Sequence, residues 1–341
     1  AALIILTGVI FLVRLFFLQV VDSSYKDTAD SNARRIEIQY PARGLIYDRT
    51  GELLVYNEAA YDLMVTPAQL SSFDTIDFCD ILEIPREEVI TRIRAARDYS
   101  MFKPSIFLKQ ISSETYAVMQ EKLYKFPGFF VQPRTLRKYP RDVAPHALGY
   151  VGEVDENHIE ENPYYQMGDY IGVSGIEKSY EEVLRGEKGM KIFLVDVHNR
   201  VKGSYQGGRA DRKAQVGRNL VSTLDADLQE YGEKLMGNFR GSIVALEPSS
   251  GDILALVSAP AYKPSLLVGR VRSANFTALS EDTLKPWFNR ALMAYYSPGS
   301  TFKTVNGLIG LQEGVIHYGS EFYCDLGFHM AGYTAVSYTH L

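Results

Sequence analysis

Ser300 and Lys303 stand three residues apart in the stretch YYSPGSTFK, and a serine with a lysine at this spacing can be an activated nucleophile. The next residues, STFKTVNGLIGLQEG, have apolar side chains at helical spacing and predict a buried helix that ends at Gly314. Residues i and i+3 share a helix face, so Lys303 is expected beside Ser300. A buried lysine with a lowered pKa can accept the serine proton, and the helix N-terminus favours the developing negative charge. In the catalytic interpretation of this pattern, Ser300 is the nucleophile and Lys303 the proton acceptor.

An ordinary helix start is the alternative interpretation, in which Ser300 is an N-cap and Lys303 is solvated. The spacing alone is not specific, because Ser23 and Lys26 repeat it in a polar segment with no apolar helix behind it. A lysine at the start of an apolar helix is costly to bury without a role, which favours catalysis. From these residues alone both interpretations stay open.

Composition limits the classes of function and partner. The net charge is −5 and no basic run alternates with aromatic residues, so we expect no nucleic-acid partner. The six histidines and two cysteines are scattered without metal-ligand spacing, so we expect no metal and no cofactor.

The first 21 residues, AALIILTGVIFLVRLFFLQVV, form an apolar segment with one charge, Arg14. A helix of this length spans about 30 Å, the thickness of a bilayer core. A cleaved signal peptide is the alternative, but no small-residue cleavage site follows closely. We therefore predict an uncleaved transmembrane helix at 1–21.

The elements that must position the serine alternate between strands and helices, which predicts an α+β, multidomain fold. A strand–turn–strand unit is expected at 41–57, with a type I turn at Asp48–Gly51. Three short helices form a helical insertion at about 67–125. An amphipathic helix should carry Ile176, Tyr180 and Leu184 on one face, and a largely buried hairpin should turn at Pro248–Gly251.

Four stretches of the chain resemble the class B penicillin-binding proteins, in the order expected for that family. RGLIYDRTG at 43–51 matches the motif Arg-Gly-x-Ile-x-Asp-Arg-x-Gly, and WFNRALMAYYSPGSTFK resembles the approach to the active-site serine. SGIEKSYEEVLRGEKG and TLDADLQ are also similar to family segments. The long first module resembles the elongation-type member, with the division-type member as the alternative.

The resemblance implies a membrane-anchored, β-rich pedestal followed by an acyl-serine transpeptidase domain of α/β/α type with an antiparallel sheet. The expected domains are the anchor at 1–21, a dimerisation or pedestal domain at 22–215 and the N-terminal part of the transpeptidase domain at 216–341. Ser300 would be the nucleophile for D-Ala-D-Ala stem peptides and for β-lactams, and Lys303 the proton acceptor. The motif residues would be structural, with Asp and Arg able to pair: Arg43, Gly44, Asp48, Arg49 and Gly51.

The resemblance also implies a cellular location and binding partners. The chain would sit in the bacterial cytoplasmic (inner) membrane as a single-pass protein, with the catalytic domain on the periplasmic or extracellular side. Its partners would be peptidoglycan stem peptides, a glycosyltransferase of the SEDS family and elongation scaffold proteins.

The sequence departs from the family pattern after the serine. A Ser-x-Asn and a Lys-Ser/Thr-Gly are expected downstream of Lys303, and neither is present in these 341 residues. Ser273-Ala274-Asn275 has the right letters but precedes the serine. We therefore expect a C-terminally truncated, inactive piece of a transpeptidase. A non-enzymatic membrane scaffold and a Ser-x-x-Lys hydrolase or β-lactam sensor are the alternatives, and the pedestal motif argues against the latter.

Overall fold

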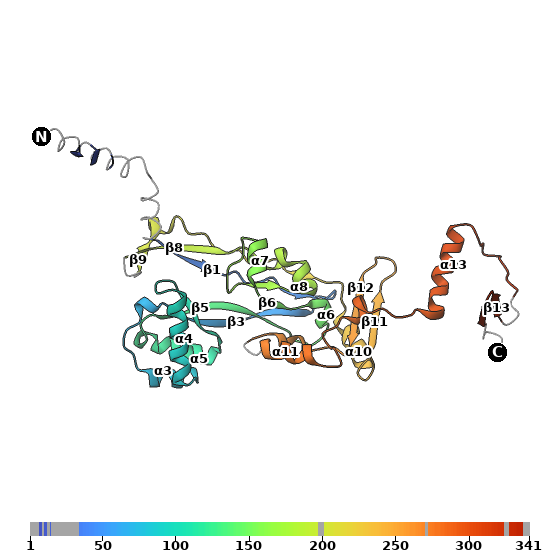
Figure 1. The fold of residues 1–341 in the computed structure, drawn as a ribbon, viewed down its shortest axis with the longest axis horizontal. Helices are drawn as coiled ribbons and strands as arrows, with labels where there is room; N and C mark the ends of the chain where they lie inside the picture. Colours follow the sequence, from blue (N-terminus) through green and yellow to red (C-terminus); the bar gives the residue numbers. More distant parts are fainter. Residues whose placement is uncertain are drawn as a thin grey trace. The chain divides into compact units, whose positions relative to one another are not determined.

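A computed structural model gives the structure of residues 7, 8, 10, 11, 14, 34–196, 201–269, 272–323 and 327–336. The chain forms two compact units, Ala1–Met293 and Ala294–Leu341 (Figure 1). Most of the transmembrane helix expected at 1–21 lies outside the described residues. Among those that are described, no helix combines the length and the apolar character needed to cross a membrane.

The secondary structure is mixed, as the sequence predicts. The strands are β1 (Arg34–Gln39), β2 (Ile46–Tyr47), β3 (Leu53–Val65), β4 (Ser105–Ile111), β5 (Phe129–Lys138), β6 (Val151–Glu153), β7 (Tyr170–Gly172), β8 (Gly189–Val195), β9 (Val201–Ser204), β10 (Leu220–Val221), β11 (Gly241–Leu246), β12 (Ile253–Ala259), β13 (Gly327–Met330) and β14 (Tyr333–Val336). The α-helices are α3 (Thr75–Leu82), α4 (Arg86–Tyr99), α5 (Ser113–Lys122), α6 (Pro145–Leu148), α7 (Glu156–Glu161), α8 (Gly175–Ser179), α9 (Glu181–Leu184), α10 (Ala226–Leu235), α11 (Arg272–Glu281), α12 (Arg290–Met293) and α13 (Lys303–Gln312).

A long antiparallel ladder is the central feature of the first unit. β3 and β5 pair from Tyr56–Lys138 to Val65–Phe129, and β4 pairs with the far end of β3. β2 joins β3 on its other side and brings in the parallel strand β10, giving the order β10-β2-β3-β4. Figure 1 shows β3 and β5 running away from the helices α3, α4 and α5. A separate sheet has the order β1-β8-β9.

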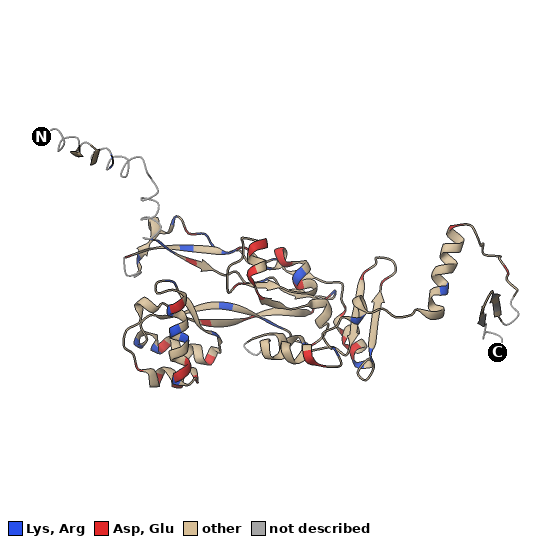
Figure 2. Cartoon of the chain, viewed as in Figure 1, with Lys and Arg blue, Asp and Glu red and all other residues tan. Residues whose placement is uncertain are grey.

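The helical insertion contains the three helices that the sequence predicts. Local capping explains where two of them begin, because Asp74 accepts hydrogen bonds from the backbone of Ile76 and Asp77, and Ser112 accepts one from Thr115. The structure adds the strand β4 between α4 and α5, which the sequence analysis did not predict. Phenylalanine rings meet edge to face between these helices and the ladder, with Phe78 and Phe107 fully buried. Residues of both charge signs occur along these helices (Figure 2).

Two expected elements differ from the structure. The helix predicted through Ile176, Tyr180 and Leu184 is two short helices, α8 and α9, because Tyr180 leaves helical geometry with φ −112° and ψ 25°. The hairpin with a turn at 248–251 is confirmed as β11 and β12, but β11 is not largely buried. Its side chains alternate between exposed and half-buried, since within the described unit α10 covers β12 rather than both strands.

The residues at and just before β10 lie against the residues that precede β2. The backbone N–H of Gly217 donates to Ala42 and that of Leu220 donates to Leu45, at 2.9 and 2.8 Å. The residues on both sides of the boundary predicted at 215/216 thus belong to the first compact unit. The boundary itself stays a prediction.

Candidate functional site

Ser300 lies in a 3₁₀ turn, Gly299–Phe302, which runs directly into α13 at Lys303. The helix predicted from Ser300 is therefore confirmed, and it ends before Gly314, which has a φ of +69°. The predicted burial is wrong. Leu308 is 67% exposed, and both Ser300 and Lys303 lie on the surface.

The exposure of α13 has a simple structural reason. The second unit contains, besides this helix, the two-stranded hairpin of β13 and β14, and the described residues of the unit place no sheet over the apolar side of α13. Lys303 is the one charged residue within the helix itself (Figure 2). The catalytic roles of Ser300 and Lys303 stay predictions.

Asp48 accepts several hydrogen bonds within the motif at 43–51, and the residue is only 2% exposed. Its Oδ1 accepts hydrogen bonds from the backbone N–H and hydroxyl of Thr50 and from the backbone N–H of Glu52, each at 2.8 Å. Its Oδ2 accepts one at 3.3 Å from the N–H of Ala226, the first residue of α10. Burial raises the pKa of Asp48, but these donors outweigh it and leave the pKa below its usual value. The turn is thereby tied to a helix 178 residues later.

The expected pairing of Asp and Arg within the motif is not what the structure contains. Asp48 is held by hydroxyl and backbone donors, while Arg49 is exposed and uses its backbone N–H to bond Leu224. Arg43 instead turns toward two glutamates. Its Nε lies 2.9 Å from Oε2 of Glu177, and its Nη1 lies 3.1 Å from Oε1 of Glu181.

Arg137 completes a buried group that we call the Arg43 cluster: Arg43, Arg137, Glu177 and Glu181. The Nε of Arg137 lies 2.7 Å from Oε1 of Glu177, whose side chain has no exposed area. Nη1 of Arg137 also donates to the carbonyl of Gly44 at 2.8 Å. The cluster thus joins the motif at 43–51 to the segment at 174–189, the first and second of the four family-like stretches along the chain.

The charges in the cluster compensate one another. Burial lowers the pKa of Arg43, but the two glutamates outweigh it and raise the pKa above its ordinary value. Burial raises the pKa of Glu181, but hydrogen bonds from Arg43 and Gly172 hold it below its ordinary value. For Arg137 burial prevails and lowers the pKa, although Glu177 opposes the shift. The cluster contains two arginines and two glutamates, so its formal charges cancel.

The two glycines of the motif serve different purposes. A Cβ at Gly44 would fall 1.9 Å from the carbonyl oxygen of Arg218, so this position needs a residue without a side chain. Gly51 has a φ of +92° with open space around it, so its requirement is conformational. Both requirements concern the backbone at the turn, and the structural role of the motif stays a prediction.

Comparison with known proteins identifies the family of this chain. The model of the penicillin-binding protein dimerisation domain matches residues 38–222, and the penicillin-binding protein transpeptidase domain matches residues 241–339. The chain belongs to the penicillin-binding proteins. Within the family it is similar to the peptidoglycan D,D-transpeptidases MrdA of Acinetobacter baumannii, with 31% identity over 97% of this chain, and of Escherichia coli K12, with 33% identity over 92%.

The similarity to solved structures points to the same branch, penicillin-binding protein 2. Penicillin-binding protein 2 of Helicobacter pylori, in complex with MreC, matches 89% of this chain and 58% of its own chain with a TM-score of 0.71 at 25% identity. The chain spans about half the length of the curated relatives, 49% and 50% for the two MrdA proteins.

Proposed function

We propose that the protein is an elongation-type peptidoglycan D,D-transpeptidase in which Ser300 is the nucleophile. The observation that carries the proposal is the place of Ser300, in a turn that leads into α13 within the residues matched by the transpeptidase model. A serine at the start of a helix has its Oγ near backbone N–H groups that can stabilise an oxyanion.

The reaction follows from these residues. The Oγ of Ser300 attacks the carbonyl carbon of the penultimate D-Ala of a stem peptide, and Lys303 accepts the hydroxyl proton. The peptide bond breaks, and the terminal D-Ala leaves as the amine after it takes up a proton. The amine of a neighbouring stem peptide then attacks the acyl-serine ester, which releases Ser300 and forms the cross-link.

Labelling with a fluorescent penicillin in the native membrane tests the nucleophile. We expect the label on the peptide that contains Ser300 and its loss in Ser300→Ala. Ser23→Ala is the matched control, because Ser23 precedes Lys26 at the same spacing, and it should leave labelling unchanged. A label that persists in Ser300→Ala would refute the assignment.

The 341-residue chain by itself is expected to form no cross-links. It contains neither a Ser-x-Asn after Lys303 nor a Lys-Ser/Thr-Gly, and the residues that the structure describes leave the apolar side of α13 exposed. Incubation of the purified chain with lipid II-derived glycan strands and mass spectrometry of the digested peptides measure this. Dimeric muropeptides in the digest would contradict the expectation.

We also propose the membrane setting and partners of an elongation enzyme: a single-pass anchor at 1–21 in the cytoplasmic membrane, the remainder on the periplasmic side, a SEDS-family glycosyltransferase and an MreC-like scaffold. The apolar sequence of residues 1–21 and the MreC complex of the Helicobacter pylori protein support this. Protease added to spheroplasts should degrade residues 34–341. Full protection of these residues would contradict the proposed orientation.

A further inference from the structure

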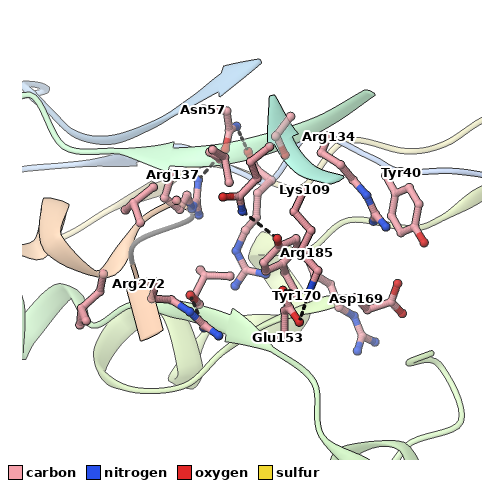
Figure 3. A pocket seen from close by; sticks show the side chains of 18 of the residues that line it. Tyr40, Asn57, Lys109, Arg134, Arg137, Glu153, Asp169, Tyr170, Arg185 and Arg272 are labelled. Atoms are coloured by element: carbon pink, nitrogen blue, oxygen red, sulfur yellow. Dashed lines mark hydrogen bonds and ion pairs between the residues drawn. The ribbon is translucent and has the colours of Figure 1, made fainter. Parts of the chain in front are cut away.

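A cavity of about 420 Å³ lies inside the first unit, next to the Arg43 cluster. Its walls come from β4, β5, β6, β7, the residues after α9 and the start of α11, and it includes neither Ser300 nor Lys303 (Figure 3). A cavity of this size can hold a small organic molecule. Its lining is dominated by positive charge, because eight arginine and lysine side chains line it, against two carboxylates.

Six of the eight cations are neutralised by a carboxylate of their own. Arg43 and Arg137 are balanced by the two glutamates of the Arg43 cluster. The other four, Arg92, Lys109, Arg134 and Lys188, pair with Glu88, Glu153, Asp62 and Asp169 in that order. The cavity therefore carries an excess of two positive charges, which belong to Arg185 and Arg272.

Arg185 and Arg272 have no carboxylate within 4.0 Å in the part of the chain that the structure describes. The Arg185 guanidinium stacks on the ring of Tyr164 at 4.0 Å, and its Nη1 donates to the hydroxyl of Tyr165 at 3.1 Å. The side chain of Arg272 makes one hydrogen bond to the described residues, a long one of 3.5 Å from Nη1 to the carbonyl of Val151. Arg185 is thus held in place by aromatic side chains, while most N–H groups of both guanidinium groups have no acceptor among the described residues.

Gln110 provides a second, independent observation at the same cavity. Its backbone has a φ of +54°, a left-handed conformation that is unfavourable for a residue with a side chain. Its amide Nε2 bonds the hydroxyl of Tyr170 at 2.9 Å, while its buried Oε1 has no hydrogen-bond partner among the described residues. Buried polar atoms are almost always paired, so an unpaired one in a cavity wall indicates a missing polar partner.

We propose that this cavity binds a small anion with two negative charges, carried by phosphate or carboxylate groups, through Arg185 and Arg272. The planar guanidinium fork matches both of these groups, and two such forks at one cavity suit a dianion. The low-dielectric walls and the surplus charge strengthen the attraction. A hydroxyl group of the same ligand donates a hydrogen bond to Oε1 of Gln110, because this oxygen can only accept.

Isothermal titration calorimetry of the purified chain tests the proposal, with glycerol 3-phosphate and malate as separate probes at pH 8 and matched ionic strength, since each carries two negative charges and a hydroxyl group. We expect saturable binding of at least one probe, and the two arms distinguish a phosphate from a carboxylate ligand. Arg272→Gln should weaken binding about 10-fold or more, which corresponds to about 1.4 kcal/mol, because the change removes charge-assisted hydrogen bonds to the anion. Arg185→Gln should weaken it similarly.

Arg94→Gln is the matched control, because Arg94 is exposed on α4 and does not line the cavity. It should change the affinity less than about twofold. Arg272→Gln is the cleaner variant, since Arg185 also supports two tyrosines and its loss can affect folding. No saturable binding of either probe would overturn the proposal, and so would equal weakening by Arg94→Gln and Arg272→Gln.

Discussion

Replacing Glu177 by Gln tests the idea that the Arg43 cluster holds the first unit together. Glu177 has no exposed area and faces Arg43 at 2.9 Å and Arg137 at 2.7 Å. Gln has nearly the same volume, so the change leaves packing intact. It removes one negative charge and turns an amide N–H group toward an arginine donor.

The expected loss of stability follows from the charge balance. The wild-type cluster is neutral, and Glu177→Gln leaves one buried positive charge without compensation. Breaking a buried ion pair from one side costs about 3–5 kcal/mol. At about 2–4 °C per kcal/mol for a large domain, we expect the unfolding temperature to fall by roughly 10 °C.

Trp287 is a natural reporter for this measurement. It is the only tryptophan of the chain and packs in the first unit against Tyr150 and Tyr262, with ring centroids 5.2 and 5.0 Å away. Urea titration followed by its fluorescence gives the free energy of unfolding. Glu58→Gln is the matched control. Glu58 on β3 pairs with Lys138 on β5 at 3.1 Å, but both side chains are about half exposed.

The control should cost less than about 1 kcal/mol, as exposed ion pairs do. Adding Arg137→Gln to Glu177→Gln should cost less than the sum of the two single changes, because the second change removes a charge that the first left unpaired. If Glu177→Gln and Glu58→Gln lower stability equally, the reasoning from the charge balance is refuted.

The other predictions concern the motif turn and one histidine. Gly44→Ala should cost about 3 kcal/mol or more in urea unfolding, because its Cβ meets a backbone oxygen, whereas Gly51→Ala should cost only about 1–2 kcal/mol for its positive φ. Asp48→Ala should cost about 1–3 kcal/mol at neutral pH, and since the folded-state pKa of Asp48 is lowered, its contribution should fade as the pH falls below 3.8. Burial lowers the pKa of His146 in the folded state, so stability should decline as the pH falls below 6.5, and His146→Gln should flatten that part of the profile. An unchanged slope in His146→Gln would contradict the assignment.

Local interactions made several elements predictable from the sequence. Two of the three helices in the insertion begin at a side chain that accepts hydrogen bonds from the first backbone N–H groups, Asp74 for α3 and Ser112 for α5. Apolar residues at helical spacing also indicate these helices. The turn at Asp48–Gly51 and the helix after Ser300 follow from equally short stretches. The strand β4 escaped prediction, because its seven residues lie between two helices and are stabilised by pairing with β3, not by a local signal.

The sequence by itself thus determined the local elements, the pedestal motif and the serine–lysine pair, because each depends on residues a few positions apart. Only the tertiary structure decided that Arg43 pairs with Glu177, 134 residues later, and not with Asp48. It also decided that eight cations line one cavity, where Arg185 and Arg272 have no carboxylate partner among the residues that the structure describes. The partner of a buried charge depends on the path of the whole chain, and hydrophobic periodicity and turn chemistry carry no information about that path.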